Sequence, residues 1–149
     1  MDQNEFRQRA HELVDWMADF LDSIEDYPVK SQVKPGEIYD QLPAHPPRSA
    51  ESFDDILSDF KEIIMPGITH WQHPSFFAYF PANSSKPSVL AEMLTATLGA
   101  QCMSWQTSPA ATELEERVMN WLAEMIGLGE GFHGVIQDTA STSTLASIL

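Results

Sequence analysis

The first two dozen residues alternate apolar and polar positions with the period of an α-helix. Apolar side chains recur at spacings of three and four from Phe6 to Ile24, and charged side chains fill the positions between them. This spacing predicts an amphipathic helix from Asp2 to about Ile24. Because such a helix is stabilised mainly by burying its apolar face, it needs a partner surface, which a second subunit could supply.

The region after this helix has little periodicity. Residues 26–47 hold five of the ten prolines in the chain, and each proline fixes one backbone angle and removes one hydrogen-bond donor. We therefore predict an extended arm with a turn at Pro35 and Gly36. A short amphipathic helix is predicted from 52 to 64, with Ser52 as the N-cap, because a serine side chain can accept a hydrogen bond from the first turn.

Three more helices are indicated in the second half of the chain. One begins near Pro87, and its apolar side chains are predicted to face inward; another begins at Ser108 and carries an apolar stripe. After a glycine-rich break, residues 134–136 predict a buried strand, and residues 141–149 predict the start of a further helix. No capping signal follows this last segment, so we expect the chain to be the front part of a longer protein.

The composition argues against several classes of function. Eight Lys and Arg residues against 22 Asp and Glu residues give a formal net charge of −14, which repels nucleic acids and anionic lipid surfaces. A single cysteine, Cys102, excludes an intrachain disulfide, and the five histidines lack the spacing of metal ligands. The first residues lack the basic and apolar regions of a signal peptide, and no run is long enough to span a membrane. We therefore expect a cytoplasmic protein without a metal site.

Aromatic residues are concentrated between Thr69 and Ser85. This segment carries Trp71, Phe76, Phe77, Tyr79, Phe80 and Pro81, interleaved with the polar residues His70, Gln72, His73 and Asn83. One interpretation is a core strand with an aromatic plug, because aromatic side chains are common in protein cores. The alternative is the wall of a pocket for a flat, aromatic ligand, since the interleaved polar groups need hydrogen-bond partners.

A hydroxyl-rich turn follows the predicted strand. It consists of Thr139, Ala140, Ser141, Thr142, Ser143 and Thr144. Hydroxyl side chains are the usual N-caps, so the turn could simply start a helix. Small side chains at this place also let a phosphate approach backbone N–H groups, although the turn is neither a Walker loop nor a dinucleotide-binding fingerprint. An aromatic wall followed by an anion site indicates a phosphorylated, planar cofactor.

Four segments carry a resemblance to a known family. They are "YPVKSQVKPG", "GITHWQHPSFFAYFP", "SWQTSPAATELE" and "GVIQDTAST", in this order. Together they resemble the amino-terminal third of the group II pyridoxal-phosphate-dependent decarboxylases, in the aromatic L-amino-acid decarboxylase branch. The resemblance implies the type I fold of pyridoxal-phosphate-dependent transferases, an α/β fold like that of aspartate aminotransferase. Residues 1–84 would form a mainly helical N-terminal dimerisation segment with the arm and the aromatic stretch, and residues 85–149 would begin the large cofactor-binding domain with its first strand, loop and helix.

The same resemblance implies a homodimeric enzyme that uses pyridoxal 5'-phosphate to decarboxylate an aromatic L-amino acid to the amine and CO2. The implied substrate-binding positions are Trp71, Tyr79, Phe80 and Pro81, with Gln101 and Met103 offered to the substrate across the dimer, and the implied cofactor-binding positions are Ala140, Ser141 and Thr139. Gln101 is more polar than the family pattern, so the identity of the amino acid stays open.

The chain also departs from the family pattern next to the expected phosphate. Asp138 stands where the family usually has glycine, and its carboxylate should weaken phosphate binding unless the side chain points away. The family's cofactor-binding lysine, the aspartate that pairs with the ring nitrogen and the histidine that stacks on the ring are all expected beyond Leu149. No catalytic residue is therefore assigned in this chain, since Lys30, Lys34, Lys61 and Lys86 lack the matching context. The remaining part could continue the polypeptide or travel as a separate one.

Two alternatives to a decarboxylase remain open at this point. Within the same fold, the protein could be an oxidative, aldehyde-forming variant, or it could act on another amino acid. From a different class, it could be a catalytically inert helical interaction module derived from such an enzyme. That module would bind a partner through the helix face that carries Phe6, Leu13, Met17 and Phe20.

Overall fold

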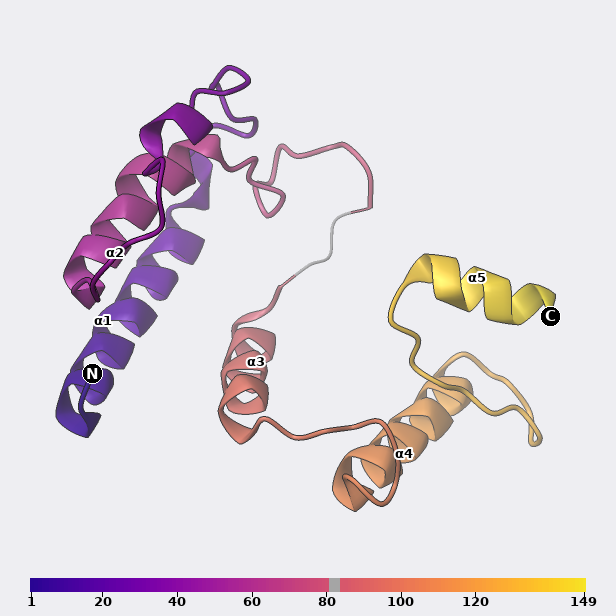
Figure 1. Cartoon of the computed structure of the whole chain (residues 1–149). Coiled ribbons are helices and arrows are strands. Elements are labelled where there is room, and N and C mark those ends of the chain that lie inside the picture. Colours follow the sequence, from indigo (N-terminus) through magenta and orange to yellow (C-terminus); the bar gives the residue numbers. More distant parts are fainter. Residues whose placement is uncertain (81–83) are drawn as a thin grey trace. The chain divides into compact units, whose positions relative to one another are not determined.

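A computed structural model gives the structure of residues 1–80 and 84–149, and Figure 1 shows its helices along the chain. The chain divides into two compact units, Met1–Ser85 and Lys86–Leu149. Within the described ranges every regular element is a helix. None of the helices in these ranges combines the length and the apolar character that crossing a membrane requires.

The first unit begins with the long helix α1, Gln3–Asp22. The Asp2 carboxylate caps it by accepting hydrogen bonds from the N–H groups of Asn4 at 2.8 Å and Glu5 at 2.9 Å. These bonds, that of Glu5 first, hold the pKa of Asp2 below its usual value because they favour the charged carboxylate. The short 3-10 helix η1, Ile24–Asp26, follows. Helix α1 confirms the amphipathic helix that the apolar spacing predicts.

The second helical stretch of this unit changes its winding along its length. Helix α2, Phe53–Asp59, continues into the π-helical turn η3, Phe60–Ile64, and then into the 3-10 turn η4, Met65–Gly67. The Ser52 hydroxyl oxygen accepts a hydrogen bond from the Asp55 N–H at 3.1 Å. The predicted helix and its N-cap are therefore confirmed, although the wider turn of η3 interrupts regular α-helical winding.

The proline-rich arm between these helices is mostly irregular, as its composition predicts. Its turn forms at Gly36, which has a φ of +92°, a conformation that glycine adopts without strain. The Asp40 N–H donates to the Gly36 carbonyl at 2.8 Å, and the short 3-10 helix η2, Tyr39–Gln41, follows. Elsewhere in the arm the Ser31 hydroxyl donates to the Pro66 carbonyl at 2.8 Å, which attaches the arm to the end of the second helical stretch.

Aromatic and ionic contacts join α1 to the second helical stretch, and Figure 1 shows the two side by side. The Trp16 ring stacks on Phe20 with centroids 5.4 Å apart and meets Phe60 edge to face at 5.5 Å. The guanidinium of Arg9 contacts the Asp54 carboxylate at 2.5 Å. Asp54 lies on α2 and Phe60 lies on η3, so these contacts hold the two stretches together.

Three shorter helices make up the second unit. They are α3, Lys86–Leu98, α4, Pro109–Met125, and α5, Ala140–Ile148. Ser108 is the N-cap residue of α4. Gly127, with a φ of +75°, follows the end of α4, where glycine tolerates the left-handed conformation that stops a helix. The three helices predicted for this half of the chain are confirmed.

The prediction of a buried strand at residues 134–136 is wrong. The segment is irregular, and Val135 and Ile136 have exposed fractions of 65% and 63%. A strand needs a neighbouring strand to satisfy its backbone groups, and the described residues of this chain form none. Instead, the Ile136 N–H donates to the Glu115 carboxylate on α4 at 2.8 Å.

The inward orientation predicted for the apolar side chains of α3 is also wrong within this chain, and the apolar stripe of α4 is exposed as well. Large exposed side chains on these helices are Leu90, Met93, Leu94, Leu98, Leu114, Trp121, Leu122 and Met125. Exposure on this scale is unusual, because contiguous apolar surface generally packs against something. The apolar spacing predicted the helices correctly, but no described part of the second unit covers their apolar faces.

Candidate functional site

The aromatic segment forms a cluster of stacked rings on an irregular loop. The Trp71 ring stacks with Phe76, with centroids 4.9 Å apart and planes inclined by 25°, and with Tyr79 at 5.5 Å and 10°. Residues 68–80 contain neither helix nor strand, and Trp71 is 44% exposed. The interpretation as a buried core strand is therefore wrong, and an exposed aromatic surface is present instead.

Successive backbone turns support the start of this cluster. The His70 N–H donates to the Val29 carbonyl in the arm at 2.9 Å, and the His73 N–H donates to the His70 carbonyl at 3.1 Å. The Phe76 N–H then donates to the His73 carbonyl at 2.9 Å. The Nδ1 atom of His73 accepts a further hydrogen bond from the Ser75 N–H at 2.9 Å. His73 thus organises the turn that leads into Phe76.

The far end of the cluster is held less firmly. Tyr79 has a φ of +57°, a left-handed conformation that costs a residue with a side chain about 1–2 kcal/mol. Its ring contact with Trp71 offsets part of that cost. The ring of Phe80 is 99% exposed. Pro81, the remaining residue of the predicted pocket wall, lies outside the described residues, as does Asn83.

His70 lies at the base of the aromatic segment and is buried, with an exposed fraction of 4%. Its ring lies 4.9 Å from that of Tyr27 and 5.7 Å from that of Phe20. Burial, and secondarily the nearby His73, holds the pKa of His70 below its usual value, because a charged imidazolium is poorly solvated there. The segment therefore has a neutral, buried anchor at one end and exposed rings at the other.

Sequence reasoning grouped Phe76 with the other rings but did not assign it to the site. The structure distinguishes it from its neighbour Phe77, which is 92% exposed and has no ring contact within the described residues. The signal available in the sequence was the five-residue interval between Trp71 and Phe76, but an irregular loop has no fixed period. For this reason, spacing alone could not identify the stacked pair.

The hydroxyl-rich turn forms the N-terminus of α5. Thr139 is the N-cap, and its hydroxyl oxygen accepts from the Thr142 N–H at 3.1 Å, while its carbonyl accepts from the Ser143 N–H at 3.0 Å. The first N–H groups of a helix have no acceptor inside the helix, and within the described residues those of Ala140 and Ser141 have none. Both residues are exposed. Two backbone donors at the positive end of a helix dipole can bind an anion.

The positive electrostatic potential at this helix start comes from the backbone, and the Asp138 carboxylate before the cap opposes it. No Lys or Arg occurs from residue 118 to residue 149, so the donors near the turn are N–H groups and hydroxyls. Asp138 is exposed and lies immediately before the cap. Its carboxylate makes no hydrogen bond or ion pair within the described residues, so it does not compete for the N–H groups of the first turn.

The two residues expected to reach the substrate across a dimer lie in the loop between α3 and α4. Gln101 and Met103 are both exposed. The loop is attached to the start of α4 by the Trp105 indole N–H, which donates to the Glu113 carboxylate at 2.9 Å. Their assignment to a substrate site stays a prediction. In the described ranges no group of three or more His, Cys, Asp or Glu side chains could hold a metal ion.

Comparison with known proteins identifies the family. Residues 35–149 match the pyridoxal-dependent decarboxylase conserved domain. This chain belongs to the pyridoxal-dependent decarboxylase family. Over its whole length it is 48% identical to the aromatic-L-amino-acid decarboxylase of Mus musculus and 47% identical to the phenylacetaldehyde synthase of Arabidopsis thaliana.

A solved structure of this family shares the fold. The tryptophan decarboxylase of Catharanthus roseus, crystallised in complex with L-tryptophan, matches 99% of this chain with a TM-score of 0.92 and 43% identity. The chain covers 33% of that structure, and 33% and 32% of the mouse and Arabidopsis proteins. It therefore has the fold of about a third of a type I pyridoxal-phosphate-dependent decarboxylase, as the resemblance implied.

Proposed function

We propose that this chain is the N-terminal part of a pyridoxal-phosphate-dependent enzyme that decarboxylates an aromatic L-amino acid to the amine and CO2. The observation that carries the proposal is the exposed stack of Trp71, Phe76 and Tyr79 in a chain of this family. Exposed aromatic rings favour a flat, apolar side chain, because ring stacking adds to the gain from burying apolar surface. The aromatic amino-acid decarboxylase of the mouse, 48% identical along the chain, supports the same substrate class.

The N-terminus of α5 fits the phosphate of the cofactor. The N–H groups of Ala140 and Ser141 and the Ser141 hydroxyl are exposed donors, and Thr139 fixes the turn through its cap. We propose that these three residues hold the phosphate, since a helix N-terminus stabilises an anion through its N–H groups and its dipole. When bound, pyridoxal phosphate supplies a ring that withdraws electrons from the bond to the departing carboxyl group.

The chain's own residues then orient the substrate and exclude water. The rings of Trp71, Tyr79 and Phe80 present apolar surface that a substrate side chain would cover, which lowers the free energy of binding. We propose that Gln101 and Met103 perform a similar role for the second subunit of a homodimer. The amide of Gln101 adds a hydrogen-bonding group, so a substrate with a polar ring substituent suits it.

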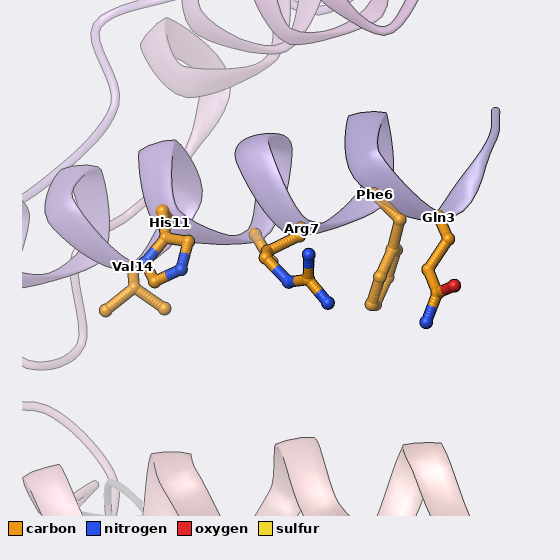
Figure 2. Close-up of a pocket in the computed structure, with 6 residues that line it drawn as sticks. Gln3, Phe6, Arg7, His11 and Val14 are labelled. Atoms are coloured by element: carbon orange, nitrogen blue, oxygen red, sulfur yellow. The ribbon is translucent and has the colours of Figure 1, made fainter.

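We further propose that the homodimer uses the open face of α1. Shallow space of about 420 Å³ on this face is lined by Gln3, Phe6, Arg7, Ala10, His11 and Val14, and in Figure 2 the labelled side chains project from the same side of the helix. The apolar part of such a face gains stability when another surface covers it. A cytoplasmic location is also proposed, on the acidic charge and the single cysteine.

A second candidate function is the aldehyde-forming variant of the reaction. The Arabidopsis phenylacetaldehyde synthase is 47% identical over the whole chain, almost as similar as the mouse decarboxylase. The inert interaction module has weaker support, because part of its proposed binding face is already used. Phe20 packs against Trp16 and Tyr27 within the first unit, and it is therefore not free for a partner.

The decisive experiment is a product analysis on the complete protein. The purified enzyme is loaded with pyridoxal phosphate and incubated with L-tryptophan, L-tyrosine, L-DOPA or L-phenylalanine, and amine, aldehyde and CO2 are quantified. Amine with an equal amount of CO2 supports the proposal, whereas aldehyde with CO2 supports the second candidate. If none of the four amino acids releases CO2 from cofactor-loaded protein, the proposed substrate class is wrong.

A further inference from the structure

We propose that Phe76 is a positioning residue for the substrate site: its ring fixes the Trp71 indole, and through Trp71 it sets how tightly an aromatic substrate binds. The two rings stack with centroids 4.9 Å apart and an interplanar angle of 25°. The substrate part of this role rests on the proposed function, because it requires Trp71 to contact the substrate. The contact between the two rings does not.

The orientation of Trp71 depends on ring contacts. Its indole N–H donates no hydrogen bond within the described residues, and the side chain is 44% exposed. An indole without a hydrogen-bonded N–H can turn about its side-chain torsions unless neighbouring rings limit it. Phe76 and Tyr79 are the two rings that stack with it.

Phe76 is the better anchored of these two rings. Its side chain is half-buried and its N–H is bonded to the His73 carbonyl at 2.9 Å. Tyr79 is exposed and has a left-handed backbone with a φ of +57°, which its side chain makes unfavourable. Trp71 is therefore fixed mainly from the side of Phe76, and Tyr79 follows the position of Trp71.

A series of backbone hydrogen bonds connects Phe76 to the interior of the first unit. The Val29 carbonyl binds the His70 N–H, the His70 carbonyl binds the His73 N–H, and the His73 carbonyl binds the Phe76 N–H. His70 is 4% exposed, so this series starts from a buried residue. Phe76 thus connects Trp71, at the surface, to the packed base of the loop.

The first test reports on the ring contact without using activity. The complete, cofactor-loaded protein is labelled with 5-fluorotryptophan, and the fluorine NMR signal of Trp71 is assigned from the Trp71→Phe variant. Phe76→Leu should shift this signal toward that of a solvent-exposed indole. Phe76→Tyr, which keeps an aromatic ring, should leave the signal at its wild-type position. Phe77→Leu is the matched control, because the adjacent ring is 92% exposed and lacks a ring contact in the described chain. If Phe76→Leu is insoluble, Phe76→Met serves the same purpose.

The second test measures kcat and KM for decarboxylation of an aromatic L-amino acid by the same variants. Loss of one stacked pair should raise KM about two- to tenfold with a smaller change in kcat, and Phe76→Tyr should return KM to the wild-type value. A purely structural role would instead lower the active fraction, and thus kcat, without this rescue. That result would overturn the proposal.

The two tests separate the possible failures. An unshifted Trp71 signal in Phe76→Leu would overturn the ring-positioning role whatever the activity. A shifted signal with unchanged KM in an active enzyme would overturn the link to the substrate while the proposed function stands. If the wild-type protein decarboxylates no aromatic amino acid, the proposed function and the substrate role fail together, and the fluorine signal alone decides whether Phe76 holds Trp71.

Discussion

The aromatic stack and the start of α5, the two regions that we propose to hold a ligand, are built in opposite ways. At the stack, side chains form the surface: Trp71 contacts Phe76 and Tyr79 on a loop without regular structure. At α5 the backbone provides the donors, and Thr139 only fixes the turn from which they project. A surface made of side chains is sensitive to which residue occurs, whereas a backbone site is sensitive to whether the N–H group and the turn are kept.

This difference predicts which substitutions each region tolerates. At α5, replacing one small residue by another keeps the N–H groups, so the main damage comes from removing a donor. At the stack, each ring carries its own contact area, so every truncation has an effect in proportion to the lost contact. The following experiments test this contrast, beginning with the largest expected effect.

Ala140→Pro is expected to weaken the affinity for pyridoxal phosphate about ten- to hundredfold, on the scale of one lost hydrogen bond to a charged group. Proline at the first position of a helix removes one N–H but leaves the helix intact. The preceding Thr139 has φ −146° and ψ 161°, an extended conformation that a following proline accepts. Equilibrium dialysis of the complete protein measures the affinity, and circular dichroism confirms the helix content.

A suitable control for this experiment is Ala146→Gly, near the other end of α5. It perturbs the helix without touching its first turn, so cofactor affinity should change little. An unchanged affinity in Ala140→Pro would mean that this N–H does not bind the phosphate, and the assignment of Ala140 to the site would then be wrong.

Ser141→Ala is expected to weaken cofactor affinity by about 1–2 kcal/mol, roughly five- to thirtyfold, because a hydroxyl that binds a phosphate makes a charge-assisted hydrogen bond. The backbone donor of residue 141 remains, so the loss should be smaller than in Ala140→Pro. The matched control is Ser147→Ala, whose hydroxyl instead donates to the Ser143 carbonyl at 2.8 Å. Equal affinities for the Ser141 and Ser147 variants would remove the Ser141 hydroxyl from the site.

The sequence predicted the features that depend on residues close together along the chain and missed those that depend on distant residues. The caps at Ser52 and Thr139 involve residues three positions apart, and such local contacts are specified by the residue types alone. The strand at 134–136 failed because a strand is stable only when another strand pairs with it, which local pattern cannot guarantee.

The aromatic site was intermediate between these two cases. Ring density located the segment, yet the partners of Trp71 could not be derived, because a loop of turns has no period that relates spacing to contact. The buried position of His70 was not predicted either. It results from packing against Phe20 and Tyr27, and Phe20 lies fifty positions away in the sequence.

Trp71→Ala is expected to raise KM for an aromatic amino acid about three- to tenfold and to leave cofactor affinity unchanged. The indole is the central ring of the stack, so its removal also releases Phe76 and Tyr79. Steady-state kinetics at saturating cofactor measure KM, and dialysis measures cofactor affinity. A parallel loss of cofactor affinity would contradict the separate roles of the side-chain surface and the backbone site.

The smallest expected effect concerns the pH dependence of stability at the base of the stack. Burial lowers the pKa of His70 in the folded chain, so the unfolded chain, with a histidine pKa of about 6.5, binds more protons than the folded chain in the window beneath that value. The free energy of unfolding should therefore be highest above this window and fall as the pH drops through it, by at most about 1.4 kcal/mol per pH unit for one proton.

Urea unfolding of the complete protein across this range measures the slope of the free energy of unfolding against pH. His70→Gln should reduce this slope. His45→Gln, which changes an exposed residue of the arm, should keep it. Equal slopes in the wild type and His70→Gln would show that His70 does not couple protonation to folding. Because the first turn of α5 contains no histidine, hydrogen exchange should show acid-induced loosening in the aromatic segment and none at that turn.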